Sequence, residues 1–162
     1  MDIVVNASPL ILLCKVGHVE LLRKVCRTVC VPEGVVAEIR AAPDDPACRA
    51  LDTYDWLQRV AVSVPDGIKA WDLGRGESEV VAHALVAPGF RPLLDDAEGK
   101  ACSLAFGLRP LGTGGLLVHA KKLGFLDSVG EVLDNMRARG LWISDPVCRA
   151  ILQQAGERSR PV

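Results

Sequence analysis

Short apolar runs alternate along the chain with longer stretches in which apolar residues recur every three or four positions. The short runs are rich in β-branched residues and predict buried strands, whereas the longer stretches predict amphipathic helices. The expected strands are residues 3–5, 28–31, 59–64, 91–94 and, as a short last strand, 109–111. The expected helices are residues 8–16, 18–25, 32–39, 47–55, 77–86, 96–106, 115–123, 128–139 and 146–155, and residues 142–144 fit either an edge strand or an extended link. This alternation is typical of an α/β fold, in which helices cover both faces of a parallel sheet.

The composition fits one ordinary domain. The 162 residues are 49% hydrophobic, 24% charged and only 4% aromatic, which excludes a disordered chain and predicts an aliphatic core. We expect a single domain over residues 1–162, with a flexible tail at about 157–162. The first residues run directly into a strand-like stretch, without a basic segment or a long apolar one, so we expect a cytoplasmic protein with no membrane anchor.

Cysteines and basic residues carry little information about function. The six cysteines form no C-x-x-C pair and the three histidines are scattered, which favours buried thiols over a zinc site. The net charge of −1 provides no overall attraction for nucleic acid. Local basic groups are best interpreted as solvated helix faces; they comprise Arg23, Lys24 and Arg27, and also Lys121 and Lys122.

Polar residues follow two of the expected strands, at the edge where open α/β sheets bind ligands. Asn6 and Ser8 follow the first strand, and Asp95 and Asp96 follow the strand at 91–94. Ser8 fits a helix N-cap, and Asp95 with Glu98 three residues later fits a capping box. However, a cap needs one side chain, whereas two adjacent acids at the end of a buried strand repel each other. The pair therefore predicts a nearby cation.

Glu77 opens a helical stripe whose other members, Val80, Val81 and Ala84, are apolar. A carboxylate in the first turn is favourable without any function, because the helix dipole attracts negative charge there. The position nevertheless places Glu77 near the edge of the sheet. Glu79 lies on another face of this helix, and we expect it to pair with His83 four residues later.

Four carboxylates from distant segments, Glu38, Glu77, Asp95 and Asp96, form the pattern of a hard-cation site. Glu38 borders the apolar stripe of its own helix. Magnesium or manganese bound by such oxygens suits phosphodiester hydrolysis, because the ion polarises the phosphate and lowers the pKa of an attacking water. The glycine-rich segment 112–115 fits either a phosphate-cradling turn or a tight turn that opens a helix. We favour the tight turn, since the G-x-G-x-x-G spacing and the P-loop lysine are missing.

Several weak motifs, taken in their order along the chain, resemble those of PIN-domain proteins. The chain is similar to uncharacterised prokaryotic members of the family that resemble VapC-type toxins, and the likeness covers residue 3 to about residue 155. The segments that carry it are Val4 to Leu10, Val31-Pro32 with Glu38, Gly76-Glu77-Ser78-Glu79, Leu94-Asp95-Asp96, and Gly112 to Leu117.

This resemblance implies a PIN-like three-layer fold with a central parallel sheet of four to five strands. It implies a Mg²⁺- or Mn²⁺-dependent endoribonuclease that acts on an RNA substrate. The implied catalytic residues are Asp96, Glu77, Glu38 and Asp95, the implied metal ligands are these four with Asn6, and Ser8 is implied to order the site. The resemblance further implies the toxin of a toxin–antitoxin pair, inhibited by a small antitoxin, and a homodimer, which the high apolar fraction also favours.

One position departs from the family pattern. Most active PIN nucleases carry Asp after the first strand, and this chain has Asn6. An amide oxygen can coordinate a hard cation, but it lacks the full negative charge of a carboxylate and cannot act as a base. The alternative interpretation is therefore a catalytically weakened PIN-like protein that acts as an RNA- or protein-binding regulatory module.

Overall fold

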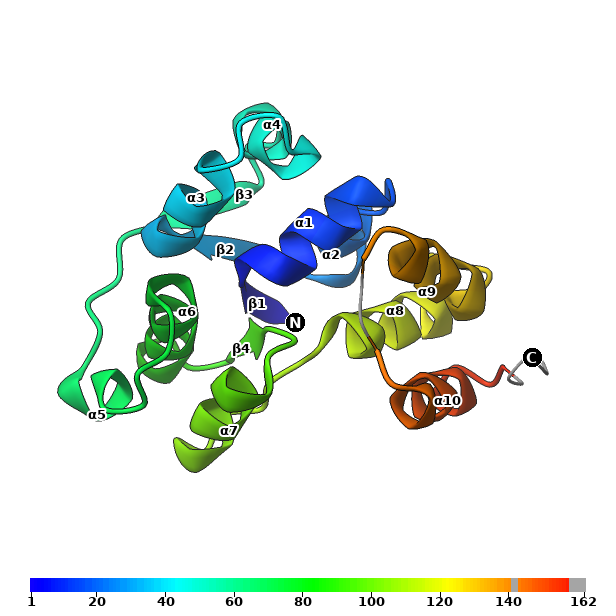
Figure 1. Ribbon diagram of the computed structural model, residues 1–162. Coiled ribbons are helices and arrows are strands. Elements are labelled where there is room, and N and C mark those ends of the chain that lie inside the picture. Colours follow the sequence, from blue (N-terminus) through cyan, green and yellow to red (C-terminus); the bar gives the residue numbers. More distant parts are fainter. Residues whose placement is uncertain (141–142, 158–162) are drawn as a thin grey trace.

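The computed structural model describes residues 1–140 and 143–157. Its strands form one parallel sheet in the order β3–β2–β1–β4 (Figure 1). The strands are β1 (Asp2–Val5), β2 (Thr28–Pro32), β3 (Leu57–Val60) and β4 (Phe90–Leu93). The fold is therefore the expected α/β architecture with a parallel sheet.

Most of the rest of the described chain is helical, and the helices enclose the sheet. They are α1 (Ala7–Lys15), α2 (Glu20–Val25), α3 (Glu33–Arg40), α4 (Pro46–Thr53), α5 (Asp66–Lys69), α6 (Arg75–Val86), α7 (Ala97–Ala105), α8 (Thr113–Lys122), α9 (Val129–Ala138) and α10 (Asp145–Gln154). Figure 1 shows α8, α9 and α10 grouped on one side of the molecule, with α3, α5 and α6 on the opposite side. No helix in the described ranges is long and apolar enough to cross a membrane.

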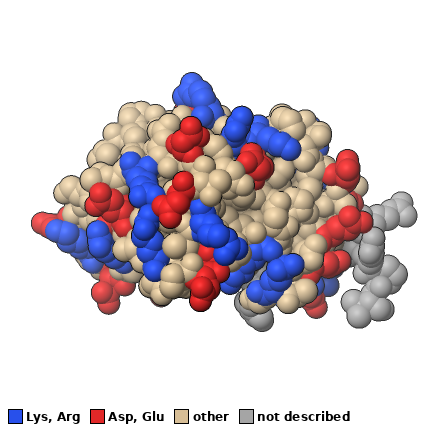
Figure 2. Space-filling model, turned by 90° about the horizontal axis from the view of Figure 1, so that it is seen from above, with Lys and Arg blue, Asp and Glu red and all other residues tan. Residues whose placement is uncertain are grey.

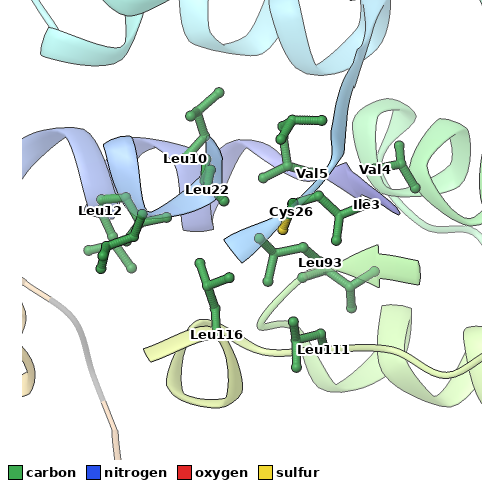
Figure 3. Packing of buried hydrophobic residues seen from close by; sticks show 14 of the residues in the cluster. Ile3, Val4, Val5, Leu10, Leu12, Leu22, Cys26, Leu93, Leu111 and Leu116 are labelled. Carbon is green, nitrogen blue, oxygen red and sulfur yellow. The ribbon is translucent and has the colours of Figure 1, made fainter. Parts of the chain in front are cut away.

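The core is aliphatic and surrounds the two central strands. Every residue of β1 is buried, and since neighbouring residues of a strand point to opposite faces, both faces of the sheet are covered. Figure 3 shows Ile3 and Val5 of β1 among Leu10, Leu93 and Leu116, which come from α1, β4 and α8. This packing of neighbouring elements around β1 fixes the edge of the sheet at which β1 and β4 end.

Three short segments differ from the sequence-based expectation. β3 ends at Val60 and not at Val64, because its partner β2 ends at Pro32, which pairs with Val60 and opens α3. Residues 109–111 make only one isolated bridge, between Leu93 and Leu111. The four-residue helix α5 was not predicted; it is held by Ile68, which is fully buried.

Two sequence-based expectations concern residues outside the described ranges. Residue 142 belongs to the predicted link at 142–144, and residues 158–162 belong to the predicted tail. Glu157, the first residue of that tail, accepts hydrogen bonds from the backbone N–H groups of Val129 at 2.7 Å and Gly130 at 2.9 Å. The chain is thus bound to the start of α9 as far as Glu157.

Candidate metal and substrate cleft

The carboxyl ends of β1 and β4 lie side by side. Val5 pairs with Leu93, and the backbone N–H of Asn6 donates to the Leu93 carbonyl at 2.9 Å. Asn6 follows β1 directly, while Asp95 and Asp96 lie between β4 and α7. The parallel arrangement therefore brings the polar residues after both strands to one edge of the sheet, as the sequence predicts.

A cleft of about 510 Å³ opens at this edge. Glu38 reaches it from α3 and Glu77 from the first turn of α6. All six residues singled out in the sequence line it, together with residues that the sequence did not indicate; the full lining is Asn6, Ser8, Ile11, Leu12, Lys15, Glu38, Glu77, Asp95, Asp96, Arg139 and Gly140. The structure thus brings the predicted residues together in a single cleft.

Asn6 is the most buried polar group of the cleft, with 5% of its surface exposed. Its Nδ2 donates to Glu77 Oε1 at 3.5 Å, whereas its Oδ1 is buried and has no hydrogen-bond partner among the described residues. A Cβ atom on Gly76 would lie 3.4 Å from this Oδ1 and 3.3 Å from Glu38 Oε2. The two oxygens therefore border the same narrow space, which the absence of a side chain on Gly76 keeps open.

The surroundings of Glu77 in the cleft raise the pKa of its carboxyl. Its burial raises the pKa of its carboxyl, the negative charges of Asp96 and Glu38 raise it further, and hydrogen bonds from the Gly74 backbone and Asn6 only partly oppose this. The carboxylates of Glu38 and Asp96 therefore repel that of Glu77 across the cleft. A cation bound among them would relieve that repulsion.

The neighbours Asp95 and Asp96 make different contacts. Asp96 is the N-cap of α7 and accepts a hydrogen bond from the Gly99 N–H at 2.9 Å. Asp95 instead accepts from Thr113 at the start of α8, through the backbone N–H at 2.8 Å and the hydroxyl at 2.6 Å. The capping box expected at Asp95 is therefore wrong, because the helix begins one residue later and Asp96 is the cap.

Ser8 is also not the N-cap that its position before Pro9 favoured. Asn6 occupies the N-cap position of α1, without a side-chain hydrogen bond to the helix. Ser8 lies in the first turn of α1 and exposes its side chain to the cleft. Its hydroxyl group is therefore available to the contents of the cleft.

Glu79 does not pair with His83, contrary to the sequence-based expectation. It is 5% exposed and accepts a hydrogen bond of 2.6 Å from the backbone N–H of Gly34, in the first turn of α3, and another from Arg75 Nε at 2.8 Å. His83 packs edge-on against Phe90. Glu79 thus joins α6, which carries Glu77, to the start of α3, which carries Glu38.

The glycine-rich segment at 112–115 serves close packing. Cβ atoms on Gly114 and Gly115 would lie 2.3 Å from Ile151 and 2.7 Å from Leu111 respectively, and a Cβ atom on Gly112 would lie 3.2 Å from Asp95 Oδ1. These glycines let α8 begin close against its neighbours and against Asp95. The segment opens a helix, as expected, but without a tight turn: Gly112 is the extended N-cap residue of α8, and Thr113 to Gly115 form its first turn.

The donor set of the cleft suits a hard cation, although its side chains do not converge on one point. In residues 1–140 and 143–157, no three His, Cys, Asp or Glu side chains come close enough together to hold a metal ion. The buried, unpartnered Asn6 Oδ1 beside the acids is nevertheless an oxygen that lacks a positive partner. An all-oxygen set of this kind has the chemistry that Mg²⁺ or Mn²⁺ prefers.

A family model described as DUF3368, a PIN domain, matches residues 2–157. The chain belongs to the PIN-domain family. The match includes every residue that lines the cleft and confirms the resemblance seen in the sequence. No curated protein and no solved structure matches the chain. PIN domains are generally nucleases that act on RNA and use divalent metals, which agrees with an acidic cleft at the carboxyl edge of the sheet.

Two cations of the PIN-domain cleft were not recognised in the sequence. Lys15, at the end of α1, could have been found from its helical spacing from Ser8, since residues seven apart share a face. Arg139 follows α9, and its place depends on how α9 packs, for which the sequence offered no signal. The basic groups considered from the sequence do not line the cleft; Arg27 pairs with Asp2 and Lys121 with Glu157.

Proposed function

We propose that this PIN domain is a Mg²⁺- or Mn²⁺-dependent endoribonuclease that hydrolyses RNA phosphodiester bonds in the cleft beside β1 and β4. The observation that carries the proposal is the buried, unpartnered Oδ1 of Asn6 beside Glu77, whose carboxylate is repelled by those of Glu38 and Asp96. Such a group of oxygens is costly without a cation and favourable with one. Membership of a family of nucleases supports the same chemistry.

The residues divide into cation-holding and supporting groups in this proposal. Glu38, Glu77 and Asp96 supply negative charge, and Asn6 supplies a neutral oxygen. Asp95 stands beside them, and its hydrogen bonds to Thr113 hold the start of α8 against the cleft. Ser8 offers a hydroxyl group to the substrate. When bound, Mg²⁺ or Mn²⁺ polarises the scissile phosphate and lowers the pKa of the attacking water.

The test is cleavage of single-stranded and structured RNA by the pure protein, with Mn²⁺ or with EDTA. Asp96→Asn is the informative variant, because Asn is also a good N-cap and should preserve α7 while it removes the charge. We expect Mn²⁺-dependent cleavage that falls by at least about 100-fold in Asp96→Asn, since even residues that only support metal ligands cost about 10–100-fold. Cleavage at the wild-type rate in this variant and in Asp96→Ala would exclude the assignment.

Asn6 supports a second candidate function, a catalytically weakened PIN-like protein that binds RNA or a protein partner in regulation. The amide adds no charge to the site, so metal affinity is lower than a carboxylate would provide. Calorimetric titration with Mn²⁺ separates the two functions: binding at millimolar metal or below favours the nuclease, and no binding favours the regulatory module. If Asn6→Asp then restores both binding and cleavage, one lost ligand accounts for the weakness.

The finer assignments come from the resemblance to VapC-type proteins. We propose that the chain is the toxin of a toxin–antitoxin pair in the cytoplasm, that a small antitoxin inhibits it, and that it forms a homodimer. Induced expression in bacteria should arrest growth with the wild type and not with Asp96→Asn, and a short protein encoded beside it should co-purify and restore growth. Light scattering at micromolar concentration tests the dimer, and a monomer mass would contradict it.

A further inference from the structure

One side of α1 lines the cleft along the whole length of the helix. Ser8, Ile11, Leu12 and Lys15 all lie in its lining, and their spacing places them on one face of α1. At 1.5 Å per residue, Ser8 and Lys15 are separated by about 10 Å along the helix axis. The cleft therefore extends from the acidic end, at Asn6 and Ser8, to a cationic end at Lys15.

Two basic side chains, from different elements, line the cleft. Lys15 Nζ lies 3.3 Å from Asp45 Oδ2, and the Lys15 side chain remains 38% exposed. Arg139 enters the lining from the far end of α9 and is exposed. It forms no ion pair with a described residue, whereas Arg137 two positions earlier is paired with Asp145 at 3.1 Å. Lys15 therefore shares its charge with Asp45, whereas Arg139 has no ion-pair partner among the described residues.

The face shown in Figure 2 does not carry a large basic surface for a polyanion. The net charge is −1, and on the face shown in Figure 2 the Lys and Arg side chains alternate with Asp and Glu and do not merge into one large basic patch. Attraction of a nucleic acid would thus depend on local groups of basic side chains and not on the overall charge. In the cleft, Lys15 offers a positive charge about 10 Å along α1 from Ser8.

We infer that Lys15 and Arg139 form a phosphate-binding end of the cleft, which holds the backbone of an RNA strand beyond the bond that is cleaved. The inference rests on the proposed function for the position of that bond. Because Lys15 lies about 10 Å from Ser8 along the helix, a strand of several nucleotides reaches both ends of the cleft, and a small phosphodiester does not. The two cations therefore select for polymeric substrates and contact backbone phosphates without reading the bases.

The test combines binding and cleavage. Binding of a fluorescein-labelled single-stranded oligoribonucleotide of mixed sequence is measured by anisotropy in EDTA, where metal-dependent cleavage is suppressed. Cleavage of the same strand and of bis(4-nitrophenyl) phosphate, a small diester, is measured with Mn²⁺. The cleft variant is Lys15→Ala with Arg139→Ala. The control variant is Lys122→Ala with Arg149→Ala, which removes the same charge from exposed positions outside the cleft.

We expect the cleft variant to bind the oligoribonucleotide about tenfold more weakly than the control variant. The slope of log affinity against log salt should become shallower by about 0.7 for each cation removed. With Mn²⁺, kcat/KM should fall about tenfold more for the oligoribonucleotide than for the small diester, mainly through KM. Equal affinities and equal salt slopes in the two variants would overturn the inference, even with an active enzyme.

The same measurements separate this inference from the proposed function. If the wild type cleaves neither substrate with Mn²⁺, and RNA affinity falls in the cleft variant but not in the control variant, the nuclease is refuted and the phosphate-binding end is supported. If the wild type cleaves RNA, and the cleft variant binds and cleaves RNA as well as the control variant does, the nuclease is supported and the phosphate-binding end is refuted.

Discussion

At the residue scale, the contrast between Asp95 and Asp96 shows how two adjacent acids acquire separate tasks. Both follow the same buried strand, and either fits the sequence pattern of an N-cap. The choice is made by Thr113, which is 2% exposed and presents two donors to Asp95. Because Thr113 lies 18 positions away in the sequence, the local pattern could not reveal this division. The sequence could predict that both acids reach the cleft, because they follow directly after a strand whose carboxyl end lies at that edge of the sheet.

Thr113→Val should be clearly destabilising. Valine preserves the branched shape of the side chain but removes the hydroxyl donor, so one oxygen of the half-buried Asp95 carboxylate loses its partner. We expect the free energy of unfolding in urea to fall by about 1–3 kcal/mol. Thr53→Val is the matched control, because the Thr53 hydroxyl donates to the Arg49 carbonyl at 2.8 Å on the exposed surface. A loss no greater in Thr113→Val than in Thr53→Val would show that the contact with Asp95 contributes little.

Glu79 illustrates a residue whose role was predicted wrongly for a physical reason. The expected pair with His83 is a local contact between helix neighbours, worth a few tenths of a kcal/mol. The Gly34 N–H is an otherwise unsatisfied donor in the first turn of α3, and it offers the carboxylate a buried, charge-assisted hydrogen bond. The stronger contact is tertiary, so it could not be found by spacing within α6.

At the element scale, Glu79 makes the pairing of α3 with α6 sensitive to one side chain. Glu79→Ala should lower the free energy of unfolding by about 2–3 kcal/mol, because it leaves the Gly34 N–H without an acceptor. Arg75→Ala is the control; the Arg75 side chain is 66% exposed, and its removal deletes the other partner of Glu79 at a cost below about 1 kcal/mol. Chemical denaturation measures both. Equal losses would mean that the buried hydrogen bond is not what joins the helices.

The start of α9 depends in a similar way on Glu157. The Glu157 carboxylate accepts from Lys121 Nζ at 2.5 Å and from two N–H groups of the first turn of α9. Burial alone would raise the pKa of Glu157, but these hydrogen bonds and the charge of Lys121 outweigh it and lower the pKa below its ordinary value. The folded state therefore stabilises the charged form of Glu157 more than the unfolded state does.

Glu157→Gln should therefore destabilise the protein in a pH-dependent way. The contribution of a carboxyl with a lowered pKa is fully present above the usual Glu value of about 4.3 and is lost as the pH falls through the folded value. We expect a loss of about 1–2 kcal/mol at pH 7 that disappears in acid. Asp134→Asn, an exposed acid on the same helix, should show no such change. Unfolding curves from pH 7 to pH 3 measure the difference, and a constant loss across this range would contradict the expectation.

Most elements could be predicted from hydrophobic periodicity, and the exceptions have identifiable causes. Val62 and Val64 alternate with polar or small residues and therefore resembled a continuation of β3, but no strand lies beside them after β2 ends at Pro32. Helix α5 is a single turn that contains Gly67, too short to show a period. The position of α9 relative to the cleft depends on packing between helices, so the sequence could not show that Arg139 lines the cleft.

At the scale of the whole molecule, the candidate site is a product of the complete fold. Its acids come from α3, from α6 and from the link after β4, and Asn6 comes from the end of β1. In the unfolded chain these residues are far apart, so a cation that needs several of them binds the folded state selectively. Metal binding and folding should therefore be coupled, and the coupling can be measured without any knowledge of the RNA substrate.

Mn²⁺ should accordingly raise the melting temperature of the protein. At a free concentration 100 times the dissociation constant, binding to the folded state alone adds about 2.7 kcal/mol, which corresponds to about 5–10 °C for a chain of this length. Asp96→Asn should lose most of this shift, because it removes one of the charges around Asn6 while it preserves the cap of α7. Glu98→Gln removes a charge from the same helical turn outside the cleft and should retain the full shift. Calorimetric scans in EDTA and in Mn²⁺ measure the three proteins, and equal shifts in both variants would place the metal elsewhere.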